Sequence, residues 1–256
     1  LQIEGISEKQ PDRTEEKRGP AIKAAFDADG NPTRAAMGFA KGLGIEASEL
    51  TTINTDKGDY VGYVQTVQGQ ATTELLPAIF QTALDNLPIV KRMRSGASRN
   101  EFVRPVQWVV LMQDSTVIDA TIQGHQTGNQ TRGHRFHSPE YHTITHANDY
   151  EQLLNGLKVV VDFDKRQAFI NNQVQALAAE VNADAIVPQS LLDEVTALVD
   201  FPIALRASFE PRFLQVPQEA LISTMQADQK YFCLTDKAGK LQPYFIFITN
   251  IQSKDA

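Results

Sequence analysis

The sequence has 256 residues, of which 42% are hydrophobic, and its formal net charge is −7. A chain of this length can bury one sizeable core or two modest ones. No apolar run approaches the roughly 20 residues that a membrane-spanning helix needs, which argues against a membrane protein. The overall acidity argues against a general nucleic-acid coat, so any contact with a polyanion must come from a local patch.

The single cysteine, Cys233, leaves no disulfide framework and no cysteine metal site. This cysteine usage favours a reducing, cytoplasmic setting. The chain begins with Leu1 rather than methionine and stops shortly after an apolar segment that reaches Ile251. We interpret both ends as cuts in a longer protein.

The pattern of residues 1–88 predicts an N-terminal α+β domain that lacks its beginning. Two short helices with small apolar residues form a light helical insertion at about residues 20–50, and Thr33 is placed to cap the second helix. Pro88 ends the domain and its last helix. The expected elements are a polar connector at 10–18, helices at 21–26 and 34–43, a strand at 60–67 and a helix at 73–87.

Residues 89–256 predict a larger α+β domain. Asp164 and Gln167 have the spacing of a capping box at the start of a long helix. Strands and helices mix without strict alternation, which indicates mixed sheets with packed helices. The expected elements are strands at 106–112 and 117–122, a loop at 124–132, a helix at 149–154, a strand at 158–163, helices from 164, 190 and 217, a strand at 203–209 and a hairpin of 230–234 with 241–251.

Arginines concentrate in two segments of the second part. Between Lys91 and Arg135 there are seven Lys or Arg residues against three acids, a local excess that indicates a surface for an anion. Guanidinium groups suit phosphates, and Phe102, Phe136 and Tyr141 can stack on bases. The alternative is a solvated charged face without a ligand. The candidate RNA- or partner-binding residues are Arg92, Arg94, Arg99, Arg104, Arg132, His134 and Arg135.

The stretch from Arg132 to His137 is the centre of this prediction. We expect Arg132 and Arg135 to bind phosphate or an acidic partner surface. Gly133 is expected to shape the loop and Phe136 to anchor it in the core. Substitution of both arginines should then weaken binding while leaving folding nearly intact, because isolated surface arginines contribute only about 0–1 kcal/mol each.

All five histidines lie between His125 and His146, which raises the question of a metal site. The spacing of His134 with His137, and of His142 with His146, is permissible for zinc. No cysteine joins them, however, and Ser138-Pro139 interrupts any single helix that would align them. We therefore interpret these histidines as solvated or packing residues and expect no bound metal.

Catalytic constellations are missing from the sequence. No Gly-x-Ser-x-Gly elbow holds a serine nucleophile, and there is neither a Walker loop nor a Gly-x-Gly-x-x-Gly motif. Asp162 and Asp164 flank Phe163, but two carboxylates alone make no acid–base pair. We assign no catalytic residue and expect the isolated chain to be inactive as an enzyme.

Several blocks, in order along the chain, carry a resemblance to a known family. They are Gln10-Pro-Asp-Arg13, Glu16-Lys-Arg-Gly-Pro20, Phe102-Val-Arg-Pro-Val106, Arg132-Gly-His-Arg-Phe136, Val216-Pro-Gln-Glu-Ala-Leu221, Asp228-Gln-Lys-Tyr-Phe232 and Asn250-Ile-Gln-Ser-Lys-Asp255. Together they make the chain similar to the front portion of the beta subunit of the bacterial two-subunit glycyl-tRNA synthetase, whose beta chain is much longer.

The resemblance implies an α2β2 enzyme that catalyses ATP-dependent glycyl-tRNA aminoacylation. It implies a class II active site on the alpha subunit, which uses ATP and Mg, and a beta subunit that handles tRNA. The partners implied are the glycyl-tRNA synthetase alpha subunit and tRNA(Gly), with no cofactor in this piece and no membrane. The later portion is similar to the tRNA-facing module of the phenylalanyl-tRNA synthetase beta chain, so residues 97–136 are expected to face tRNA or the partner subunit.

Two other functions stay open from the sequence. The chain can be a purely structural scaffold for the alpha subunit. It can also be a hydrolase module that edits mischarged tRNA in a cleft at His134, although neither a nucleophile nor a metal set supports this alternative.

Overall fold

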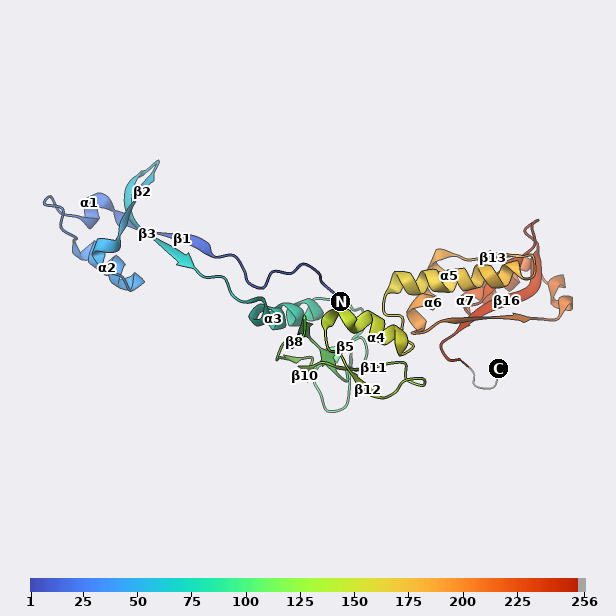
Figure 1. The fold of residues 1–256 in the computed structure, drawn as a ribbon. Coiled ribbons are helices and arrows are strands. Elements are labelled where there is room, and N and C mark those ends of the chain that lie inside the picture. The colour runs from blue at the N-terminus through green and yellow to red at the C-terminus, as the bar shows by residue number, and fades with distance from the viewer. Residues whose placement is uncertain (253–256) are drawn as a thin grey trace. The chain divides into compact units, whose positions relative to one another are not determined.

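The computed structural model describes residues 1–252 (Figure 1), and the chain divides into two compact units, Leu1–Pro88 and Ile89–Ala256. Helices and strands are mixed in both units, and the strands form several small sheets rather than one large one. Mixed sheets with packed helices were predicted, and this part of the prediction is confirmed.

The first unit contains an antiparallel sheet in the order β1-β3-β2, made of Arg13–Ala21, Gly58–Val67 and Thr51–Thr55. The prediction of a polar connector at 10–18 is wrong, because most of that segment is strand β1, paired with β3 from Arg13 to Ala21. The pairing satisfies the backbone while the charged side chains stay largely exposed. Composition alone cannot reveal such a strand, since no apolar alternation marks it.

Two helices lie between β1 and β2, as predicted for the helical insertion: α1, Ile22–Ala25, and α2, Arg34–Leu43. The Thr33 hydroxyl accepts a hydrogen bond from Ala35 N at 3.3 Å and caps α2, which confirms the predicted cap. The buried cluster beneath these helices consists of small residues, Ala25, Ala36 and Val61. A short 3-10 turn, Ala47–Glu49, precedes β2, and helix α3, Thr72–Asp85, follows β3 with Pro77 inside it.

The second unit begins with short strands in small sheets. The expected strands at 106–112 and 117–122 are broken into pieces. Val109–Val110 pairs in parallel with β10 (His125–Gly128), whereas Met112–Gln113 and Thr116–Val117 pair with each other as a short hairpin. The expected loop at 124–132 contains two strands. The elements are β4 (Met93–Arg94), β5 (Glu101–Phe102), β6 (Val109–Val110), β7 (Met112–Gln113), β8 (Thr116–Val117), β9 (Thr121–Ile122), β10 (His125–Gly128), β11 (Gln130–Arg132) and β12 (Tyr141–Thr143).

The remainder of the second unit is an antiparallel sheet in the order β13-β15-β16-β14, formed by Asp184–Ile186, Phe232–Thr235, Leu241–Thr249 and Ile203–Ser208. Helices α5, Phe163–Ala179, and α6, Gln189–Leu198, contribute to one core with this sheet, and Figure 1 shows α5 running along it. The other helical segments are η2 (Ala147–Asp149), α4 (Tyr150–Gly156), η3 (Pro211–Gln215) and α7 (Gln218–Ala227).

Three sequence predictions for this sheet and its helices need correction. Strand β13 was not predicted, because three residues give too short a pattern. The expected strand at 158–163 is absent, and α5 begins there at Phe163. Its cap is Asp162 rather than Asp164, since the Asp162 carboxylate accepts a hydrogen bond from Lys165 N at 2.9 Å.

Candidate functional site

The Arg132–His137 loop joins strands β11 and β12, which pair in antiparallel register so that Arg132 lies opposite Tyr141. The loop is held from within by His134. The His134 N–H donates to Leu157 O at 2.9 Å, and the His134 carbonyl accepts from Ser138 N at 2.8 Å. These bonds fix the backbone on both sides of the exposed loop residues.

The His134 side chain is buried, with 1% of its surface exposed. Its Nδ1 accepts a hydrogen bond from Phe136 N at 3.2 Å, whereas its Nε2 is buried and has no hydrogen-bond partner among the described residues. The ring also packs against His137, with the centroids 4.7 Å apart. The structure thus places His134 inside the protein as a support for the loop, and not on the exposed surface where a binding residue was expected.

Gly133 is required by close packing. A Cβ at this position would lie 2.5 Å from Leu157 Cβ and 2.7 Å from Leu157 O. It would also lie 2.8 Å from Ser138 Cβ. The expectation that Gly133 shapes the loop is confirmed, and the reason is lack of space at this point rather than a positive φ angle.

Arg132 lies in the corner between two aromatic rings. Its Cζ is 4.1 Å from the centre of the Tyr141 ring and 6.0 Å from that of Trp108. The two rings meet edge to face, with centroids 6.1 Å apart and planes at 78°. Among the described residues, no carboxylate oxygen lies within 4.0 Å of an Arg132 nitrogen, so its charge is available to a ligand.

The residues Arg135 and Phe136 of the loop are both exposed. Phe136 has 65% of its surface exposed, so the expectation that it anchors the loop in the core is wrong. Buried His134 has that role instead. The loop therefore exposes two successive residues, a cation and an apolar ring, on a fixed backbone.

The first basic segment forms a second group. Met93–Arg94 pairs with Glu101–Phe102, and Arg94 makes an exposed ion pair with Glu101 at 3.5 Å. Arg99, in the loop between β4 and β5, and Arg104, just after β5, are exposed, and Arg92 is half-buried. The seven predicted residues thus fall into two groups, one at the β4–β5 hairpin and one at the Arg132–His137 loop.

Trp108 was missing from the predicted stacking residues. The sequence placed it within the expected strand at 106–112, and the structure shows its ring half-buried and in contact with Tyr141 and Arg132. One feature of the sequence could have indicated its role: Trp108 is the only tryptophan of the chain and lies four residues after Arg104. Phe102, which was predicted, lies in the β4–β5 hairpin.

His146 and His137 each accept a backbone hydrogen bond. His146 lies 4.0 Å from Asp114, and its Nδ1 accepts from Asn148 N at 3.1 Å. His137 Nε2 accepts from Gln252 N at 3.2 Å. Within residues 1–252, no three His, Cys, Asp or Glu side chains are grouped as a metal site would require.

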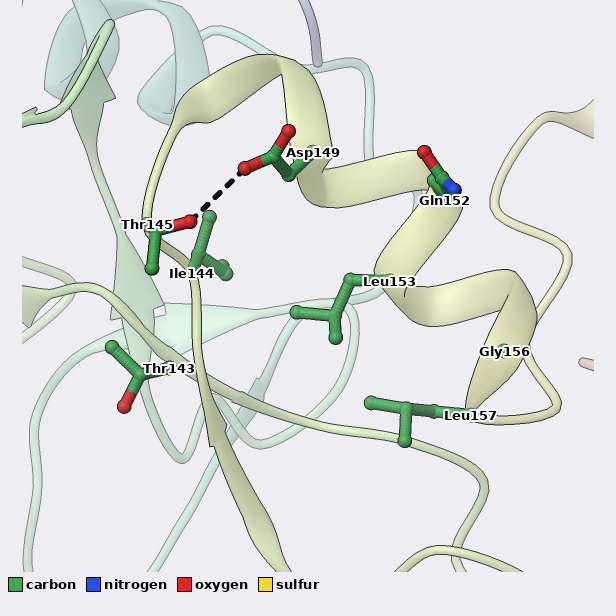
Figure 2. A pocket seen from close by; sticks show the side chains of 8 residues that line it. All are labelled: Thr143, Ile144, Thr145, Asp149, Gln152, Leu153, Gly156 and Leu157. Atoms are coloured by element: carbon green, nitrogen blue, oxygen red, sulfur yellow. Dashed lines mark hydrogen bonds between the residues drawn. The ribbon is translucent and has the colours of Figure 1, made fainter.

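A cavity of about 530 Å³ lies between the end of β12 and helix α4 (Figure 2). Thr145 Oγ1 donates to Asp149 across its rim at 3.0 Å. Its lining contains hydroxyl and amide groups and one carboxylate, that of Asp149, which accepts the Thr145 hydrogen bond. Among the described residues that line it, His134 is not found, so this cavity is not the cleft at His134 that the editing alternative requires. The lining residues are Thr143, Ile144, Thr145, Asp149, Gln152, Leu153, Gly156 and Leu157.

No helix in the described part of the chain combines the length and apolar character that crossing a bilayer demands.

Comparison with known proteins identifies relatives along the whole chain. It is 59% identical over 255 residues to the glycine–tRNA ligase beta subunit of Acinetobacter baylyi, covering 100% of this chain and 37% of that protein. The corresponding values for Chromohalobacter salexigens are 49% over 255 residues, 100% and 37%, and for Stutzerimonas stutzeri 49% over 253 residues, 99% and 36%. The chain thus spans a little over a third of the length of these curated relatives. Since the family model described as glycyl-tRNA synthetase beta subunit also matches residues 1–256, the chain belongs to that family.

Proposed function

We propose that this chain serves glycyl-tRNA synthesis as part of a beta subunit, by binding tRNA(Gly) and by assembling with the alpha subunit of glycine–tRNA ligase. The proposal places the reaction itself, with its ATP and Mg, on the alpha subunit in the cytoplasm. The single observation that carries the binding role is the Arg132–His137 loop, in which Arg132 and Arg135 are exposed and the backbone is fixed by buried His134.

The charges favour a polyanion as the ligand. Neither Arg132 nor Arg135 has an ion-pair partner among the described residues, and the segment around them is basic in a chain of net charge −7. Guanidinium groups on a preformed loop can make paired hydrogen bonds to phosphate at little entropic cost. A phosphate backbone supplies many such acceptors, which makes tRNA a better match than a single acidic side chain.

The test is a gel-shift titration of tRNA(Gly) with the full chain and with the Arg132→Ala/Arg135→Ala variant, each with and without the alpha subunit. We expect the variant to fold normally and to bind tRNA about ten-fold or more weakly. The slope of log affinity against log salt should also become shallower, by up to about 0.9 for each phosphate that the variant leaves unneutralised.

The control is Arg212→Ala/Lys237→Ala, which removes the same charge from two cations paired with Glu210 and Asp184. If both double variants weakened tRNA binding equally, the loss would reflect the change in net charge and not a specific role of the loop arginines. Normal alpha-subunit assembly with no tRNA binding by the parent chain would favour the scaffold alternative. A loop variant that unfolds, but whose folded fraction binds tRNA normally, would make the two arginines structural and overturn the proposal.

A further inference from the structure

Three side chains from three segments form a cluster that the loop arginines alone do not explain. Arg132 belongs to β11, Tyr141 to β12, and Trp108 lies just before β6. Arg132 is 4.1 Å from the Tyr141 ring centre and 6.0 Å from that of Trp108, and the two rings meet edge to face. We call these three residues the stacking cluster.

The stacking cluster is preformed and open. The β11–β12 register sets Arg132 directly opposite Tyr141, so the guanidinium reaches the ring without a change of backbone. Tyr141 is 49% exposed, and Arg132 is exposed as well. A buried cluster of this kind would serve stability, whereas an exposed one leaves planar π surface and guanidinium N–H groups for a ligand.

The chemistry of the stacking cluster fits a nucleobase better than a bare phosphate. A phosphate site needs converging N–H donors, but two of the three groups here are aromatic rings. Unpaired bases are recognised by stacking on aromatic rings and guanidinium planes, with N–H donors reaching acceptors on the base edge. An acidic protein partner would use the guanidinium but leave the exposed tyrosine and half-buried tryptophan without a role.

We propose that the stacking cluster binds one unpaired nucleobase of an RNA ligand, against Tyr141 and Arg132 with Trp108 beside them. This inference rests on the proposed tRNA-binding function and refines it. Arg135 and the charge of Arg132 attract the phosphate backbone, and the stacking cluster, in which the plane of the Arg132 guanidinium takes part, selects a single-stranded position. Double-stranded RNA, whose bases are already stacked and paired, does not enter this site.

The chain contains its own reporter, because Trp108 is its only tryptophan. The full chain is titrated with a short single-stranded RNA, with the same RNA carrying abasic positions, and with a duplex of matching length. We expect single-stranded RNA to quench Trp108 fluorescence, and we expect the abasic RNA and the duplex to bind about five-fold or more weakly without quenching.

Matched substitutions separate the ring from the charge, with affinity read from the fluorescence polarisation of labelled RNA. Tyr141→Phe keeps the ring and should bind single-stranded RNA like the parent, whereas Tyr141→Leu should lose about five-fold or more. Arg132→Lys keeps the charge, so the salt slope should stay unchanged while base-dependent binding falls. Far-UV circular dichroism verifies that each variant is folded.

The outcomes distinguish this inference from the proposed function. If abasic and base-containing RNA bind equally well, or if Tyr141→Leu binds like the parent, stacking is refuted while phosphate binding by the loop survives. If no RNA binds but the alpha subunit quenches Trp108, the stacking cluster is a protein-docking surface, and both RNA proposals are overturned.

Discussion

At the scale of single residues, some residues of the Arg132–His137 loop hold its backbone in place, and others are exposed and free to contact a ligand. Gly133 and His134 face inward against Leu157, and Arg135 and Phe136 face outward. The motif looked uniform in sequence because glycine, histidine, arginine and phenylalanine can each serve either purpose. Only the backbone direction, set by hydrogen bonds to Leu157 and Ser138, decides which side chain is buried.

Gly133→Ala should destabilise the chain by about 1–3 kcal/mol, because the added methyl group overlaps Leu157 and Ser138 at distances that a folded loop must relieve. Gly128→Ala is the matched control, since a Cβ there meets no atom within 4 Å. The free energy of unfolding in urea measures both. Equal stability of the two variants would show that the loop moves aside at no cost.

Phe136→Ala should change the free energy of unfolding by only about 0.5 kcal/mol, because 65% of the side chain is already in water. Phe232→Ala, at a fully buried position of β15, should cost about 3–5 kcal/mol in the same assay. A loss of several kcal/mol at Phe136 would support the interpretation of this ring as a core anchor.

At the scale of elements, helices were more predictable than strands. Helix α2 has its predicted bounds, because the Thr33 cap and Gly44, in the left-handed conformation at φ 74°, are local signals. Strand β1 was missed because its pairing with β3 is not encoded in its own charged residues. The candidate site was predictable as a basic segment but not as a stacking cluster, because Trp108 and Tyr141 meet only through long-range packing.

Helix α5 offers a test of its cap. Asp162→Ala should lower stability by about 1 kcal/mol, because it removes the acceptor for the Lys165 N–H. Asp164→Ala, within the first turn, should cost only a few tenths of a kcal/mol, through the helix dipole alone. Thermal unfolding of the two variants side by side decides between them. A larger loss at Asp164 would support the capping box suggested by the sequence.

Strand β15 carries the buried Cys233, and burial raises the pKa of its thiol from 9.0 to about 11. A raised pKa in the folded state means that the unfolded chain loses this proton first as the pH rises. The associated stability is therefore complete below about pH 9 and falls between pH 9 and 11, by up to about 2–3 kcal/mol. Cys233→Ala should flatten this part of the stability profile relative to the parent chain, and parallel profiles for the two would refute the assignment.

At the scale of the whole molecule, the two units differ in what they bury. The core cluster of the first unit contains Ala25, Ala36 and Val61, whereas that of the second contains large side chains such as Phe232, Ile170 and Ile246. Since hydrophobic stabilisation scales with the apolar area removed from water, the first unit should be the less stable of the two. A site that depends on the second unit alone would then survive partial unfolding of the chain.

This difference predicts two unfolding transitions. Trp108, the only tryptophan, lies in the second unit, so its fluorescence reports that unit, whereas far-UV circular dichroism reports the helices of both. In a urea titration, the dichroism signal should begin to fall at lower urea than the fluorescence, which breaks two-state behaviour. A chain of residues 89–256 should keep the fluorescence midpoint and lose the early dichroism phase. Coincident transitions in the full chain, together with a shifted fluorescence midpoint in the shorter one, would mean that the two units stabilise each other and unfold as one.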